Sequence, residues 1–208
     1  MKLVDHTVGE FSRVLGSEAP APGGGSASAL MGSLGAALVQ MVANLSAGKE
    51  KYKEHEALIA RLLSEAEEIR IAFLDVMDRD TEAFNGVSAV FAMPKSTDDE
   101  KAARRDAMQT ALKACCATPI EMMRLSLNAL TICREAVGKT NGNAASDLGV
   151  AALALKAAVQ GANLNVLINL GGIRDGDFVS SCCAECDEIL AKTLPLADAA
   201  YEEVLGSL

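Results

Sequence analysis

An uncharged stretch from Ala19 to Gly48 constrains this chain more than any other feature. It begins APAPGGG, with two prolines and three consecutive glycines, and continues in small and apolar residues. Three structures could contain such a stretch: a membrane anchor, a phosphate-binding loop in front of a helix, or a buried core helix. Each of them predicts a different kind of protein.

A membrane anchor is the first alternative, because the stretch is long enough to cross a bilayer. However, Gln40, Asn44 and four serines lower its hydropathy, and acidic residues precede it. The net charge of −9 also argues against binding to an anionic membrane surface or to a nucleic acid backbone. We therefore expect neither a membrane nor a nucleic acid as partner.

A phosphate-binding loop is the second alternative. The segment PGGGSAS lacks the lysine of a Walker A motif, and no predicted strand precedes it, so neither common nucleotide motif fits. A glycine-rich turn that leads into a helix still exposes unpaired N–H groups at the positive end of the helix dipole. It also lets a flat ligand approach the backbone closely.

A buried core helix is the third alternative, because a helix that is apolar all round belongs in a protein interior. Ser28, Gly32 and Ala36 recur at four-residue spacing and would allow a second helix to pack very near. We expect this helix to begin at Gly25 or Ser26 and to end near Leu45. It explains the stretch, apart from the three glycines that follow two prolines.

The rest of the chain shows helical periodicity and no convincing alternating stretch. We expect an all-α, single-domain bundle of seven or eight helices over residues 1–208, with the small-residue helix buried at its centre. Pro119 is expected to open a new helix, and Ser146 and Thr97 or Asp98 to be N-caps. The other helices are expected at 4–15, 51–91, 98–116, 119–138, 147–161 and 177–205, with a short one in ANLNVLINL.

Six cysteines raise the question of disulfides or a metal. The first residues, MKLVDHTVGEF, carry acids where a secretory leader would be apolar, so we expect a reducing, cytoplasmic setting without a disulfide framework. Cys183 and Cys186 have the spacing of a zinc motif, but the only histidines, His6 and His55, lie far upstream. We therefore expect no metal site, and we expect these cysteines to be small apolar residues on a helix.

Asp80 is the candidate acid or base. It precedes Phe84 by four residues, so its side chain should lean toward the buried stripe of its helix. A carboxyl group that is partly desolvated there would have a raised pKa and could transfer protons near neutral pH. The alternative is a surface salt bridge.

Polar residues elsewhere could bind a ligand or serve structure. Asn165 and Asn169 share a helical face among apolar residues, so they form either a structural network or a polar wall for a heterocycle. Asn143 and Asp147 precede an apolar helix and could serve a turn, a cap or a ligand. Lys49 and Lys51 could be a solvated helix start or could bind carboxylates.

Several motifs taken together resemble the cyclodeaminase/cyclohydrolase family of folate enzymes. They are APAPGGGSASAL, MVANLSAGKEKY, DRDTEAF, MPKSTDDEKAAR, NGNAASDLGVAA and GANLNVLINL, which occur in this order along almost the whole chain. Members of that family include the C-terminal half of formimidoyltransferase-cyclodeaminase and stand-alone bacterial methenyltetrahydrofolate cyclohydrolases. The chain looks like the stand-alone form.

The resemblance implies an all-α homodimer that binds folate near the subunit interface, without a metal or any cofactor beyond the tetrahydrofolate substrate. It implies either hydrolysis of 5,10-methenyltetrahydrofolate to 10-formyltetrahydrofolate, which we favour, or closure of 5-formimidoyltetrahydrofolate with release of ammonia. A helical scaffold that binds folate without turnover is the remaining alternative.

The resemblance also implies roles for single residues. Asp80 takes the position of the family's acid/base aspartate. Pro22, Gly23, Gly24 and Gly25 would lie along the pterin or the aminobenzoate. By residue type and position, Asn143, Asp147, Asn165 and Asn169 would line the pterin, and Lys49 and Lys51 would bind the glutamate tail.

Overall fold

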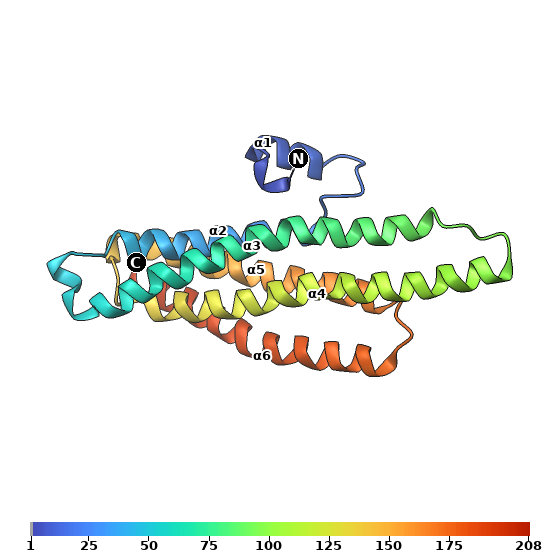
Figure 1. Ribbon diagram of the computed structural model, residues 1–208. Helices are drawn as coiled ribbons and strands as arrows, with labels where there is room; N and C mark the ends of the chain where they lie inside the picture. The colour runs from blue at the N-terminus through green and yellow to red at the C-terminus, as the bar shows by residue number, and fades with distance from the viewer. Residues whose placement is uncertain (1) are drawn as a thin grey trace.

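The computed structural model describes residues 2–208, within which the chain forms six α-helices, three short 3-10 helices and no strand (Figure 1). The predicted all-α architecture is confirmed. The number of α-helices is six rather than seven or eight because two of them are longer than the sequence predicts. The elements are η1 (Leu3–Asp5), α1 (Val8–Leu15), α2 (Gly24–Asn44), η2 (Glu50–His55), α3 (Glu56–Phe91), α4 (Asp98–Ala136), η3 (Gly142–Ala144), α5 (Ala145–Leu170) and α6 (Gly176–Ser207).

The uncharged stretch forms α2, which packs against α3, α4 and α5. Gly32 and Ala36 are buried, as the small-residue pattern predicts. A Cβ atom at Gly32 would lie 2.7 Å from Cδ1 of Phe73, and one at Gly35 would lie 2.6 Å from Cγ of Leu155. The absence of side chains at these two glycines therefore allows α3 and α5 to pack closely against α2.

Helix α4 is continuous where a break was predicted at Pro119. A proline has no N–H, so it leaves the carbonyl of the residue four positions earlier without its helical partner. In this chain that carbonyl belongs to Cys115, and Nδ2 of Asn169 on α5 donates a hydrogen bond to it at 3.1 Å. The lost helical bond is thus replaced from a neighbouring helix.

Helix α5 also runs through its predicted end at Gly161, and it begins at Ala145 without a side-chain cap, so Ser146 is not the N-cap. Gly161 marks a close approach rather than a helix end, since a Cβ atom there would lie 3.3 Å from Cβ of Ser28 on α2. The helix that was predicted as two pieces crosses α2 at this glycine.

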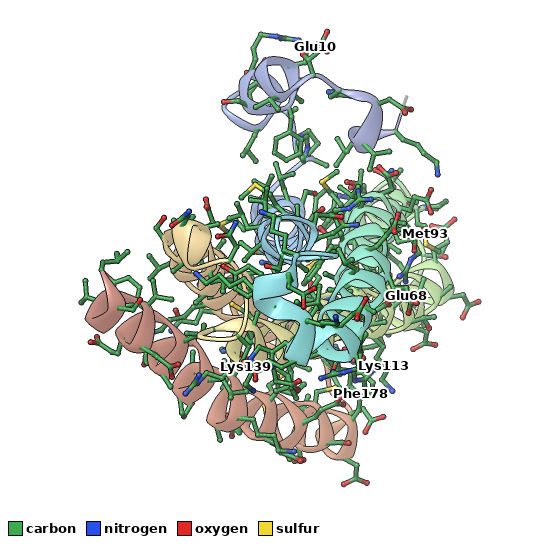
Figure 2. The ribbon with its side chains drawn as sticks, turned by 90° about the vertical axis from the view of Figure 1, so that its left-hand side faces the viewer. Glu10, Glu68, Met93, Lys113, Lys139 and Phe178 are labelled. Atoms are coloured by element: carbon green, nitrogen blue, oxygen red, sulfur yellow. The ribbon has the colours of Figure 1, made fainter. Side chains whose placement is uncertain are left out.

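The N-terminal segment lies along one side of the bundle, opposite α6, with α1 and its Glu10 outermost (Figures 1 and 2). Helix α1 begins with a capping box in which the backbone N–H of Glu10 donates to Thr7 at 3.2 Å. The backbone N–H of Leu3 donates to Oδ1 of the buried Asp78 at 2.8 Å, which ties the segment to α3.

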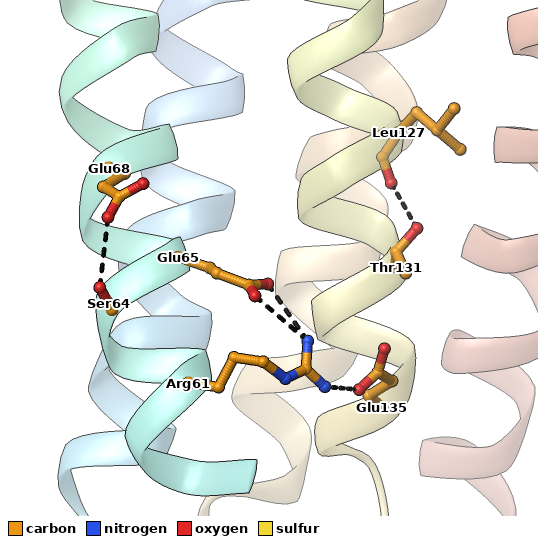
Figure 3. A network of polar contacts seen from close by, with 7 residues as sticks. All are labelled: Arg61, Ser64, Glu65, Glu68, Leu127, Thr131 and Glu135. Carbon is orange, nitrogen blue, oxygen red and sulfur yellow. Dashed lines mark hydrogen bonds and ion pairs between the residues drawn. The ribbon is translucent and has the colours of Figure 1, made fainter.

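Helices α3 and α4 form an antiparallel pair that is cross-linked by ion pairs. Arg61 of α3 pairs with Glu135 of α4 and with Glu65 on its own helix (Figure 3). Further along, the guanidinium of Arg79 donates to both carboxylate oxygens of Glu121, at 2.9 and 2.7 Å. Thr97, one of the two residues predicted as the N-cap, caps the start of α4 through a capping box.

Candidate functional site

Asp80 lies where α3 passes the first turn of α2. Its Oδ1 accepts a hydrogen bond from Oγ1 of Thr118 on α4 at 3.2 Å. A Cβ atom at Gly25 would lie 2.8 Å from Cγ of Asp80, closer than real Cβ contacts come. The backbone at position 25 can therefore approach the carboxyl group only because the residue is glycine.

The surroundings of this carboxyl group favour its neutral form. Burial raises the pKa of Asp80 above its usual range, while hydrogen bonds from Thr118 and Ser26 partly oppose that rise. Among the carboxyl groups with a shifted pKa, Asp80 is the one shifted upward; the pKa values of Glu10, Glu100, Asp175 and Glu188 are lowered. The raised pKa is the one that the sequence predicted for this position.

The first turn of α2 supplies backbone donors beside Asp80. Gly23 is the N-cap and offers no side chain to the first N–H groups of the helix. These groups have no partner within a helix and lie at the positive end of its dipole. Gly23 and Gly24 are exposed, whereas Pro22, Gly25 and Ser26 are buried, so the outer edge of the turn faces solvent and its inner edge faces Asp80.

Asn165 adjoins the same turn from α5, and Asn169 lies one helical turn further along α5. A Cβ atom at Gly24 would lie 3.6 Å from Nδ2 of Asn165. The amide nitrogens of both asparagines serve structure, because Asn165 donates to the carbonyl of Gly161 at 2.7 Å and Asn169 donates to the carbonyls of Cys115 and Asn165. Within residues 2–208 no hydrogen bond reaches either Oδ1 atom, so the two amide oxygens remain as acceptors for a ligand.

The other four predicted binding residues lie at the opposite end of α2. This helix has 21 residues, so its two ends are about 30 Å apart. Lys49, Lys51 and Asn143 are exposed, and Asp147 lies in the first turn of α5. A single chain does not bring these four residues to Asp80.

Two cavities lie at that opposite end. One of about 290 Å³ is lined by Lys51, Tyr52 and Asn141 among others, and one of about 100 Å³ includes Lys49. Asn141 stabilises the turn before α5, because its Nδ2 donates to the carbonyl of Leu45 at 3.3 Å and its Oδ1 accepts from the N–H of Asn143 at 3.1 Å.

Sequence reasoning missed Thr118 and Cys115. Thr118 contacts the carboxyl group of Asp80, and Sγ of Cys115 donates to the carbonyl of Ala83 at 3.2 Å. The only signal for Thr118 in the sequence was its position directly before a proline inside a helical pattern. Within residues 2–208 no group of three or more His, Cys, Asp and Glu side chains is arranged to hold a metal ion.

Comparison with known proteins gives the family. The sequence model described as formiminotransferase-cyclodeaminase matches residues 7–188. The chain is 38% identical over 200 residues to a methenyltetrahydrofolate cyclohydrolase from Methylorubrum extorquens, covering 96% of both chains. The chain belongs to the formiminotransferase-cyclodeaminase family.

Two further relatives show how members of this family differ. The chain is 35% identical over 176 residues to the formimidoyltransferase-cyclodeaminase of Gallus gallus. The aligned region spans 85% of this chain but only 32% of that protein. The crystal structure of formiminotetrahydrofolate cyclodeaminase from Thermotoga maritima superimposes with a TM-score of 0.88 at 28% identity, over 99% of this chain and 98% of that one. The fold of the family is therefore shared over the whole chain.

Proposed function

We propose that this protein hydrolyses 5,10-methenyltetrahydrofolate to 10-formyltetrahydrofolate. The observation that carries the proposal is the half-buried Asp80, with its raised pKa, beside the glycine turn of α2, which Asn165 of α5 also approaches. The near full-length similarity to a methenyltetrahydrofolate cyclohydrolase supports this choice of reaction.

In the proposed mechanism, water attacks the methenyl carbon while Asp80 accepts one of its protons. The carbon becomes tetrahedral, and the bond between this carbon and N5 then breaks. Asp80 returns the proton to N5, and the second water proton is lost as the formyl carbonyl forms on N10. The steps are proton transfers and additions at carbon, so we propose that the reaction uses no metal and no cofactor beyond the folate itself.

The glycine turn and the asparagines would orient the substrate. Gly23 and Gly24 expose backbone N–H groups to an acceptor, and Asn165 and Asn169 offer carbonyl oxygens to a donor. A pterin edge carries both kinds of group. We propose that the pterin lies between this turn and α5, with its reactive bridge at Asp80.

Cyclodeamination of 5-formimidoyltetrahydrofolate is the second candidate. It is favoured by the structural match to the Thermotoga maritima cyclodeaminase over almost the whole of both chains. In this reaction N10 attacks the formimidoyl carbon, which becomes tetrahedral as in the hydrolysis. Ammonia then leaves, and the methenyl bridge forms. Asp80 would then protonate the leaving nitrogen.

The deciding experiment measures the loss of methenyltetrahydrofolate absorbance with wild-type protein, Asp80→Asn and the control Asp187→Asn, which changes an exposed residue of α6. Positioned acid–base groups typically contribute about 10²- to 10⁴-fold, so we expect a loss of this size in Asp80→Asn alone. Ammonia release from the formimidoyl compound without hydrolysis of the methenyl compound would favour the second candidate. Folate binding without either turnover would indicate a scaffold.

We also propose that two copies of the chain pair through α2 and α5. Leu34 on α2 is 54% exposed, and Leu164 and Ile168 on α5 are 67% and 77% exposed. An exposed helix face normally carries charged residues, but α2 has none. The stripe continues along both helices through Met41, Leu45, Val150, Leu153 and Leu167.

A second copy is the occupant that fits this face. Both α2 and the segment Gly142–Leu170, which includes α5, are long and apolar enough by composition to cross a membrane, but 56% and 39% of their apolar windows are already buried in the bundle. A patch of this kind on two adjacent helices can meet its own copy across a two-fold axis. All six cysteines are unpaired, which supports the proposal that the pair works in the reducing cytoplasm.

A further inference from the structure

The hydroxyl group of Thr118 has an unusual partner for a threonine in a helix. Such a hydroxyl group commonly donates to the backbone carbonyl four residues earlier. Within residues 2–208 the other two buried threonines, Thr140 and Thr193, each make that bond at 2.8 Å. Thr118 is 5% exposed, yet it donates to Oδ1 of Asp80 on α3 at 3.2 Å. Its hydroxyl group therefore binds a side chain of the site rather than its own helix.

The two carboxyl oxygens of Asp80 face different helices. Oδ1 accepts the hydrogen bond from Thr118 of α4. Oδ2 is the atom of Asp80 nearest to the position that a Cβ atom at Gly25 would take, so it faces the glycine turn of α2. The last torsion of an aspartate side chain is soft, and rotation about it would exchange the two oxygens. The bond from Thr118 therefore fixes which oxygen faces the glycine turn.

Thr118 is itself held in place. It lies in the turn of α4 whose free carbonyl, that of Cys115, accepts a hydrogen bond from Asn169 of α5 at 3.1 Å. This bond fixes the backbone of α4 beside the site. The side chain of a threonine is branched at Cβ, so few rotations about its first bond are open to it. A stiff side chain on a fixed backbone can hold the carboxyl group of Asp80 in one orientation.

The charged neighbours of this carboxyl group have other partners. On α3, Asp78 binds the N-terminal segment and Arg79 pairs with Glu121. Helix α2 contains no charged residue, and α5 presents asparagines. Cys115 of α4 is a titratable neighbour, but burial and, to a smaller extent, the charge of Asp80 raise the pKa of this thiol, which keeps it neutral. Hydroxyl donors, with Thr118 ahead of Ser26, are therefore what stabilises the charged carboxylate.

We propose that Thr118 is a positioning residue, whose O–H holds Oδ1 of Asp80 so that Oδ2 takes the proton from water and returns it to N5. The proposal rests on the proposed function. While the hydroxyl hydrogen occupies Oδ1, the transferred proton resides on Oδ2, which faces the glycine turn where the pterin would lie. Thr118 neither gains nor loses a proton in these steps, and it acts on the folate only through Asp80.

The first test compares the hydrolysis of methenyltetrahydrofolate by the wild type, Thr118→Val and Thr118→Ser. Valine has nearly the shape of threonine but no O–H, so kcat should fall about 10- to 100-fold, with KM changed by less than about twofold. Serine keeps the O–H and should recover most of the loss. The matched control is Thr193→Val, which changes a buried threonine that binds its own helix α6 and should leave kcat as in the wild type.

The pH profile separates positioning from a merely structural role. In the proposed mechanism kcat/KM rises with pH as Asp80 of the free enzyme loses its proton. Without the donor the carboxylate is less stable, so the pKa of Asp80 is higher and the rise should move up by about one pH unit in Thr118→Val. Thr118→Ser and Thr193→Val should keep the wild-type profile. A slow Thr118→Val whose profile does not move, or a fully active one, would overturn the proposal.

A titration without folate separates this proposal from the proposed function. Carbon-13 NMR follows the aspartate carboxyl signals of the labelled protein with pH, and the signal of Asp80 is the one that Asp80→Asn lacks. Its midpoint should lie at higher pH in Thr118→Val than in the wild type or Thr118→Ser. An unchanged midpoint refutes the role of Thr118 even if the wild type hydrolyses the folate. A shifted midpoint in a protein that turns over neither folate supports the hold of Thr118 on Asp80 and refutes the proposed function alone.

Discussion

Asp80 occupies a place where ionisation is opposed by burial and only partly supported by hydrogen bonds from Thr118 and Ser26. The same residue is needed as a proton carrier in the proposed mechanism. A group whose neutral form is favoured in the folded state can hold a proton closer to neutral pH than an exposed aspartate can. The environment that suits catalysis therefore opposes stability.

The first prediction concerns this residue and the pH dependence of stability. The pKa of Asp80 is raised in the folded state above the unfolded value of 3.8. The contribution of Asp80 to the free energy of unfolding is therefore fully present below pH 3.8 and is lost as the pH rises through the folded pKa. Asp80→Asn removes this loss. We expect urea unfolding to show that the free energy of unfolding of Asp80→Asn rises relative to that of the wild type between about pH 4 and about pH 8. A difference that stays constant with pH would contradict the raised pKa.

Helix α4 shows how one element depends on a residue of another. Pro119 removes a backbone donor in the middle of the helix, and Asn169 of α5 supplies a replacement to the carbonyl of Cys115. Thr118, which contacts Asp80, lies directly beside this point. The hydrogen bond from Asn169 to the carbonyl of Cys115 thus fixes α4 against α5 at the level of the site.

The second prediction is a double-mutant cycle on these two residues. Asn169→Ala is expected to cost about 1 to 2 kcal/mol of unfolding free energy, because a buried carbonyl loses its partner. Pro119→Ala restores the helical N–H, so the cost of Asn169→Ala should be smaller in that background, with a coupling of about 1 kcal/mol. Urea unfolding of the four proteins gives the coupling. Additive effects would show that Asn169 does not replace the missing bond.

At the scale of the whole molecule, the two groups of predicted binding residues are separated by the length of α2. The glycine turn, Asp80, Asn165 and Asn169 lie near one end, whereas Lys49, Lys51, Asn143 and Asp147 lie near the other. The apolar stripe on α2 and α5 runs between the two ends. If two chains pair antiparallel along this stripe, the end of one chain that carries Asp80 lies beside the end of the other that carries Lys49 and Lys51.

The third prediction concerns this pairing. Light scattering on the purified wild type should give twice the 21.6 kDa mass of one chain. Leu164→Glu/Ile168→Glu places two charges on the stripe and should give single chains, because charges at the centre of an apolar interface are strongly unfavourable. Leu205→Glu, at a 53% exposed position of α6, is the control and should leave the mass doubled. A wild type of single mass, or one recovered only with membranes, would refute the pairing.

The sequence by itself determined the all-α class, the buried small-residue helix, a cap at Thr97 or Asp98 and the place of Asp80 near the buried stripe. These features follow from spacing and capping within a few turns of helix, which depend on neighbouring residues in the chain. The tertiary structure alone decided that α4 continues through Pro119 and α5 through Gly161. It also decided that Thr118 meets Asp80 and that the two lysines lie far from it. These outcomes depend on contacts between helices distant in sequence, and no local pattern encodes which helix supplies a missing hydrogen bond or fits against a glycine.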